Sequence, residues 1–250
     1  MRISIIQQDI LWADVAENIR KADAAIDSDP GADLYVLPEM FSTGFCTYPE
    51  GIAEEVEGES LKWMKAKAGQ TGAAIAGSVA IHEEGKYFNR FYFVKPDGEV
   101  VWYDKKHLFT FGGEHERFTA GNERVVTEFK GVRILLEVCY DLRFPIWSRN
   151  HGDYDMILYV ASWPTVRVGA WKSLLVARAI ENQCYVAGVN RVGTDPTNEY
   201  CGGSMVIDPY GKIIASCEDG TESTATADID IPALEAFRAK FPVLNDSDVL

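Results

Sequence analysis

Hydrophobic and polar positions follow two different periods along the first third of the chain. Short apolar runs at 2–8, 33–38 and 73–81 predict buried strands. After Asp14, which can cap a helix, apolar residues recur at helical spacing: Val15, Ile19, Ala22 and Ile26. A second helix is expected to begin at Ser60 and to end before the third run. The pattern therefore predicts strand, helix, strand, helix and strand in succession.

Two turn sequences interrupt this alternation further along the chain. Pro96-Asp97-Gly98 and Pro209-Tyr210-Gly211 each separate two apolar runs and predict hairpins. The remaining expected elements are strands at 87–94, 99–103, 132–138, 155–160, 184–190, 204–208, 212–217 and 224–230, and helices at 169–183 and 231–240. This order predicts an α/β fold with mixed sheets, which the hairpins allow to divide into two sheets packed face to face.

Composition narrows the class of protein. The 250 residues, 47% of them hydrophobic, are enough for one large domain, and no linker or repeat divides residues 1–250. With 24 basic and 38 acidic residues, the net charge of −14 argues against nucleic acid or an anionic membrane as a partner. It does not argue against a small anionic substrate, because a few arginines can gather locally in an acidic protein.

The cysteines and the lengths of the apolar runs indicate the cellular compartment of the protein. The five cysteines are scattered without a CxxC pair, which predicts reduced thiols rather than a disulfide framework or a zinc site. No apolar run approaches the ~20 residues of a membrane span, and the N-terminal run is too short for a signal peptide. These features predict a cytoplasmic protein.

One cysteine stands at a position that favours reactivity. The apolar run 132–138 stops at Cys139, and Asp141 and Pro145 favour a helical turn directly after it. Peptide N–H groups at such a turn stabilise a thiolate and can also hold an oxyanion. Taken alone, Cys139 can equally be a small buried hydrophobic residue.

Two other polar residues lie at the ends of predicted strands. Glu39 follows the second strand among aromatic residues, where burial would suit it to proton transfer, although a cap or a salt bridge is an alternative. Lys106 stands beside Lys105 after the first hairpin, and one of this pair is expected to point inward. With Cys139 they supply a base, a cation and a nucleophile at the sheet edge where ligands bind, which favours acyl transfer.

These blocks together resemble the nitrilase superfamily of carbon–nitrogen hydrolases. The resemblance covers nearly the whole chain and rests on Pro38-Glu39, Lys106-His107-Leu108-Phe109 and Cys139-Tyr140-Asp141-Leu142-Arg143-Phe144-Pro145, with further matches at 161–164, 177–182, 190–193 and 203–204. Within the superfamily, the segments at 7–9, 38–41 and 104–109 most resemble the bacterial omega-amidase branch. That branch hydrolyses the side-chain amide of 2-oxoglutaramate or 2-oxosuccinamate.

The resemblance implies roles for individual residues. It makes Glu39 the general base, Lys106 the oxyanion-stabilising cation and Cys139 the nucleophile that carries a thioester. Glu114 matches a second glutamate that orients the lysine, and Glu116 is its rival. The resemblance implies no metal or organic cofactor. It also implies a four-layer α-β-β-α sandwich that forms a homodimer or a higher homo-oligomer, with a C-terminal tail at about 241–250 that can reach a neighbour.

Recognition of a substrate carboxylate requires a cationic group, and arginine is the natural bidentate donor. Arg143 and Arg167 are the candidates, and Tyr140 and Trp163 are expected to form walls of the pocket. Each arginine also has an alternative interpretation, since Arg143 can be part of a structural salt bridge and Arg167 can be a solvated loop residue.

Other functions fit parts of the sequence. An amidase of the same superfamily acting on an N-carbamoyl amine or deaminated glutathione, or a nitrilase, would use the same three residues. A non-catalytic binding protein with this fold is a different class. A Rossmann protein is disfavoured because no GxGxxG follows the first strand, and a Cys-His protease using His107 or His115 is disfavoured because no protease signature is present.

Overall fold

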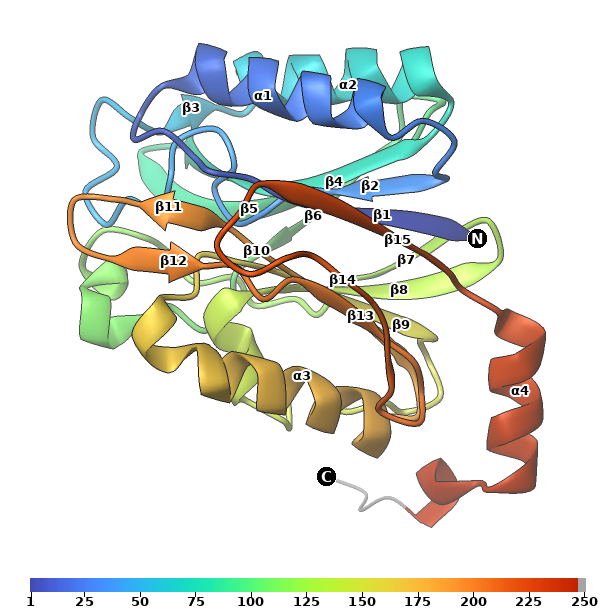
Figure 1. Cartoon of the computed structure of the whole chain (residues 1–250). Helices are drawn as coiled ribbons and strands as arrows, with labels where there is room; N and C mark the ends of the chain where they lie inside the picture. Colours follow the sequence, from blue (N-terminus) through green and yellow to red (C-terminus); the bar gives the residue numbers. More distant parts are fainter. Residues whose placement is uncertain (247–250) are drawn as a thin grey trace.

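Two mixed β-sheets pack face to face at the centre of the structure, a computed structural model that describes residues 1–246 (Figure 1). The first sheet has the order β15-β1-β2-β4-β5-β6, with β3 added to β4, and the second has the order β14-β13-β10-β9-β8-β7. Helices α1 (Val15–Ser28) and α2 (Glu59–Thr71) cover the first sheet, and α3 (Val168–Glu181) covers the second. The expected four-layer α-β-β-α sandwich is therefore confirmed.

The strand bounds follow the apolar runs closely. The first sheet contains β1 (Arg2–Gln7), β2 (Leu34–Val36), β3 (Glu54–Glu55), β4 (Ala74–Glu83), β5 (Lys86–Val94), β6 (Val100–Asp104) and β15 (Ser223–Asp228). The second contains β7 (Val126–Phe129), β8 (Val132–Val138), β9 (Met156–Ala161), β10 (Tyr185–Asn190), β13 (Met205–Ile207) and β14 (Ile213–Ser216). The two predicted hairpins are β5–β6 and β13–β14, and both are confirmed.

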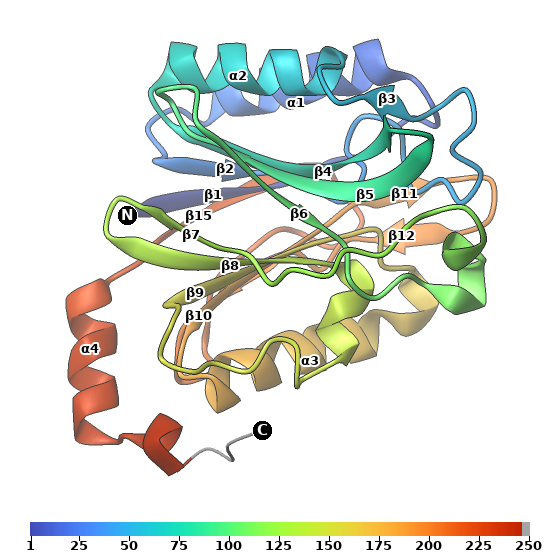
Figure 2. The ribbon, with the colours of Figure 1, turned by 180° about the vertical axis from the view of Figure 1, so that it is seen from behind.

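Alternation along the strands divides most of the core into three clusters, and a smaller fourth cluster contains Met40, Cys46, Ala80 and Phe118. Between the sheets lie apolar side chains from both inner faces, among them Ile5, Phe91, Leu136 and Val189. A second cluster lies under α1 and α2, and a third lies between the second sheet and α3. The view from behind shows β5 and β6 lying over β7 and β8 (Figure 2). These clusters occupy the faces of the two sheets. Polar side chains are therefore placed at the ends of the strands.

Several parts of the fold depart from the sequence pattern. The short strands β3 and β7 and the hairpin of β11 (Val192–Thr194) with β12 (Glu199–Cys201) were not predicted, because each strand has only two to four residues. The helical turn near the cysteine is a 3₁₀ turn, η3 (Cys139–Arg143), and Pro145 lies beyond it rather than opening a helix.

Helix α4 (Ile231–Lys240) stands beside the sandwich and not on either sheet (Figures 1 and 2). Arg238 joins it to the body through Asp155 at 2.8 Å and the carbonyl of Gln183 at 2.9 Å. Of the expected tail, the part up to residue 246 contains a short turn, Val243–Asp246, and 247–250 lie outside the described residues. Within residues 1–246, no helix has the length and apolar character needed to span a bilayer.

Candidate active site

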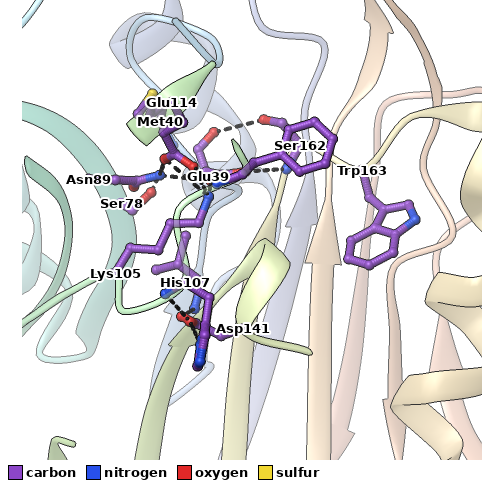
Figure 3. Close-up of polar contacts among 12 residues, drawn as sticks. Glu39, Met40, Ser78, Asn89, Lys105, His107, Glu114, Asp141, Ser162 and Trp163 are labelled. Atoms are coloured by element: carbon purple, nitrogen blue, oxygen red, sulfur yellow. Dashed lines mark hydrogen bonds and ion pairs between the residues drawn. The ribbon is translucent and has the colours of Figure 1, made fainter. Parts of the chain in front are cut away.

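Cys139 lies in a strained turn where β8 ends. Its φ is 47°, a left-handed value that is unusual for a side chain other than glycine and that is typical of functional turns. The buried carboxylate of Asp141 fixes this turn, accepting hydrogen bonds from the Val138 amide at 3.0 Å and the Tyr103 hydroxyl at 2.8 Å. It also accepts from the His107 amide at 2.9 Å, which ties the segment after β6 to the turn (Figure 3).

A buried ion cluster lies beside Cys139 at the ends of several strands. The Lys105 Nζ lies 2.9 Å from Glu39 Oε1 and 2.9 Å from Glu114 Oε2, and all three side chains are fully buried (Figure 3). Asn89 donates to both carboxylates, at 2.8 Å to Glu39 and 3.2 Å to Glu114. The Ser162 amide donates to Glu39 Oε2 at 2.8 Å. Two carboxylates and one ammonium are thus held in one geometry.

The prediction that Lys106 is the inward lysine is wrong, because Lys105 occupies that place. The Lys106 Nζ instead lies 3.3 Å from Asn122 Oδ1 and 5.4 Å from the centre of the Trp147 ring. The physical reason is the alternation of side chains in an extended chain, since Lys105 points to the same side as the buried Tyr103, two residues earlier. The segment marked by the resemblance therefore supplies a buried lysine, one residue before the position that was named.

The choice between the two glutamates is also settled by position. Glu114 is fully buried against Lys105, and its Oε2 accepts from the Phe109 amide at 2.6 Å. Glu116, two residues on, is exposed to solvent. Because the short turn η2 (Glu114–Glu116) turns only one of them inward, Glu114 is the residue that holds Lys105.

Burial and charge set the protonation of the cluster. Burial raises the pKa of the Cys139 thiol well above its ordinary value, and Glu39 raises it further, against the opposing effect of Lys105. Burial by itself would lower the pKa of Lys105, but Glu114 and Glu39 outweigh it, and the pKa of the lysine is raised. Burial also raises the pKa of Glu114. At neutral pH the thiol therefore keeps its proton and Lys105 stays cationic.

The cluster opens into a pocket that also contains the expected substrate-binding residues. Arg143 lies over the Trp163 ring at 4.9 Å, and Arg167 lies over the Phe109 ring at 5.3 Å. In the part of the chain that the structure describes, neither guanidinium pairs with a carboxylate, so the structural salt bridge considered for Arg143 is not found. The pocket is lined by Glu39, Phe45, Lys105, Phe109, Cys139, Tyr140, Arg143, Ser162, Trp163, Pro164, Arg167, Asn198 and Tyr200.

Sequence reasoning assigned no site role to four polar residues around this pocket, and one of them, Ser162, lies in the matched segment 161–164. Asn89 comes from the middle of β5, and a polar residue inside an apolar strand was an available signal for it. Asn198 and Tyr200 come from the hairpin β11–β12, which was itself not predicted. Nothing in the pattern distinguishes these two residues from those of an ordinary surface loop.

The fold and the site together define a class of protein. The family model for carbon–nitrogen hydrolases matches residues 2–239, so the chain belongs to this family. It is 48% identical over 250 residues to omega-amidase YafV of Escherichia coli strain K12, covering 99% of this chain and 97% of that protein.

Two further relatives agree with this assignment. The chain is 39% identical to 2-oxoglutaramate amidase of Bacillus subtilis strain 168, over 98% of this chain and 96% of that one. Among solved structures, a superfamily protein from Xanthomonas campestris with an arsenic adduct in its active site matches with a TM-score of 0.97 and 44% identity. That match covers 100% of this chain and 98% of the other.

Proposed function

We propose that the protein is an omega-amidase that hydrolyses the terminal amide of a short 2-oxo dicarboxylic acid monoamide, such as 2-oxoglutaramate or 2-oxosuccinamate. The observation that carries this proposal is that Arg143 and Arg167 line the same pocket as Cys139. A guanidinium with no protein carboxylate beside it suits the far carboxylate of an anionic substrate. The similarity to the omega-amidase and the 2-oxoglutaramate amidase supports the same substrate class.

In the first half of the proposed reaction, Glu39 accepts the proton of the Cys139 thiol as the sulfur attacks the amide carbonyl. The oxyanion that forms is held by the Lys105 ammonium and by the backbone N–H of Tyr140 in the turn η3. Glu39 then gives its proton to the departing nitrogen. Ammonia leaves, and a thioester between Cys139 and the acyl group remains.

In the second half, water attacks the thioester with Glu39 again as the base. The proton passes back to the Cys139 sulfur, and the acid is released, so one amide and one water give one carboxylate and one ammonia. Glu114 orients Lys105 throughout, because its carboxylate lies 2.9 Å from the Nζ. Asn89 orients both glutamates at once through its single amide nitrogen.

The assembly and the compartment are proposed more briefly. We propose one catalytic domain that works as a homodimer or a higher homo-oligomer in the cytoplasm. Exposed apolar side chains at the end of α3 and near α4 support self-association, with Ile180 52%, Tyr210 67% and Phe241 59% exposed. All five cysteines are free thiols, which supports a reducing compartment.

The substrate proposal is tested by ammonia release from 2-oxoglutaramate beside pentanamide, an uncharged amide of the same length. We expect the wild-type enzyme to prefer the anionic amide. Replacing Arg143 or Arg167 by methionine should raise KM for that substrate about tenfold, because each charged hydrogen bond contributes about 1.5–3 kcal/mol. The exposed Arg20 of α1 provides the matched control, and Arg20→Met should leave KM unchanged.

Glutamine, N-carbamoylputrescine and an aliphatic nitrile complete the substrate panel. Higher kcat/KM on any of them than on 2-oxoglutaramate would contradict the substrate assignment and leave the cysteine chemistry in place. An equal KM for 2-oxoglutaramate in wild type and both arginine variants would show that the carboxylate binds elsewhere.

A further inference from the structure

A carboxyl group that the proposed mechanism does not use is buried on the strand that leads to the nucleophile. Glu137 lies on β8, two residues before Cys139, and its side chain is fully buried. Its backbone pairs with that of Tyr159 on β9, and Tyr159 and Leu135 pack in the cluster against α3. Among residues 1–246, neither carboxyl oxygen of Glu137 has a hydrogen-bond partner. A buried polar group is costly unless it is satisfied.

A second buried group with a free donor comes from α3. Arg178 is 3% exposed, and its Nη2 donates to the Leu142 carbonyl at 2.6 Å. Its Nη1 donates to Glu181 at 2.9 Å, whereas its Nε has no acceptor among the described residues. Leu142 belongs to η3, the turn that begins at Cys139. Arg178 therefore holds the far end of the nucleophile turn while keeping one donor unused.

The groups around Glu137 determine its protonation. Burial raises the pKa of Glu137 well above its ordinary value, and Asp141 of η3 raises it further, while Arg124 and Arg178 act in the opposite direction. A charge on this carboxyl group would in turn raise the pKa values of Tyr103 on β6 and Tyr159 on β9. Burial therefore favours the neutral carboxylic acid form of Glu137, which has one donor and free acceptor positions.

We propose that Glu137 and Arg178 bind one buried water molecule behind the nucleophile turn, and that this bridge positions Cys139 for attack. The water accepts a hydrogen bond from the Arg178 Nε and another from the side-chain carboxyl O–H of Glu137. It donates one to the C=O oxygen of the same carboxyl group, which gives the roughly three hydrogen bonds of an ordered internal water. Glu137 is thus a positioning residue, and its effect on turnover rests on the proposed amidase function.

Two substitutions at one position separate positioning from simple packing. Glu137→Gln keeps one donor and one acceptor, so the bridge and the activity should be retained. Glu137→Leu removes both, and the nucleophile turn should then move, lowering kcat and the rate of Cys139 alkylation by iodoacetamide about tenfold without raising KM. Thermal stability of the leucine variant should equal or exceed that of the wild type, because an apolar side chain suits this core.

The pH dependence of stability gives a further readout. Because the folded pKa of Glu137 lies above the unfolded one, its contribution to stability is fully present at low pH and is lost as pH rises above about 4.3, the ordinary glutamate pKa. The Tm of Glu137→Gln minus the Tm of the wild type should therefore increase as pH rises from 5 to 8. Ser223→Ala is the matched control, since Ser223 Oγ on β15 is also buried and has no hydrogen-bond partner within residues 1–246, but lies far from the turn along the chain.

Three results would overturn the inference. The first is a rate of Cys139 alkylation and a kcat in Glu137→Leu that equal those of the wild type. The second is a loss of both quantities in Glu137→Gln that equals the loss in Glu137→Leu. The third is a crystal structure of the wild type with no water within hydrogen-bond distance of both Glu137 and Arg178 Nε. The alkylation and the crystal structure do not depend on substrate, so failure of the amidase assignment would be seen separately as absence of ammonia release by the wild type.

Discussion

Replacing Lys105 by methionine is expected to lower kcat about a hundred- to a thousandfold, the usual effect of removing one oxyanion donor. The same replacement at Lys106 should change kcat less than about twofold, because substitutions on the solvated surface have small effects. The difference follows from the positions of the two side chains. The Nζ of Lys105 is buried between Glu39 and Glu114, whereas the Nζ of Lys106 donates to Asn122 at the surface. Steady-state ammonia release from both variants is the measurement.

The stability of Lys105→Met must be measured alongside, because two buried carboxylates lose their cation. Circular dichroism and Tm show whether the variant folds, and Lys105→Arg keeps the charge with a different geometry as a second comparison. A large loss of kcat in Lys106→Met with full activity in Lys105→Met would contradict the assignment of the inward lysine.

Replacing Glu39 by glutamine should lower kcat by about 10²–10⁴, the range that a positioned acid–base group contributes. Burial is the largest cause of the raised pKa of the Cys139 thiol and remains in Glu39→Gln, so loss of the base leaves few thiolates to attack at neutral pH. The thiolate fraction grows as pH rises toward the raised pKa. The residual kcat of Glu39→Gln should therefore keep increasing with pH through the ordinary range of a cysteine, about 8.5, without levelling off.

The pH–rate profiles of wild type and Glu39→Gln provide the measurement. Glu99→Gln, an exposed substitution in the surface pair with Lys95, is the matched control and should follow the wild-type profile. A near wild-type kcat in Glu39→Gln, with no dependence on pH, would show that the thiol does not need this base.

Most of the fold could be predicted because its strands carry strong apolar runs. The hairpins β5–β6 and β13–β14 were marked by Pro-Asp-Gly and Pro-Tyr-Gly turns. β7 was missed because it has four residues, two of them polar, and its turn into β8 is made by Lys130 and Gly131 at positive φ instead of by a stronger turn sequence. Short strands depend on their neighbours more than on their own sequence.

The site was predictable where a polar residue ends an apolar strand. Glu39 and Cys139 both do so, and the structure brings each of them to the pocket. Two adjacent lysines gave an ambiguous signal, because residues 100–103 are all apolar and their pattern does not tell which side chains face inward. Glu137 was visible as a charge inside an apolar run, but its relation to Arg178 depends on how α3 packs on the second sheet, and no local pattern encodes that packing.

The central claim is that Cys139 carries the acyl group of an omega-amide. The most direct measurement is the intact mass of the wild-type protein after rapid acid quenching during turnover of 2-oxoglutaramate, followed by peptide mapping. We predict an adduct equal to the substrate minus ammonia on the peptide that contains Cys139, and neither adduct nor ammonia release in Cys139→Ala. Ammonia release that persists in Cys139→Ala, with no adduct in the wild type, would contradict the account.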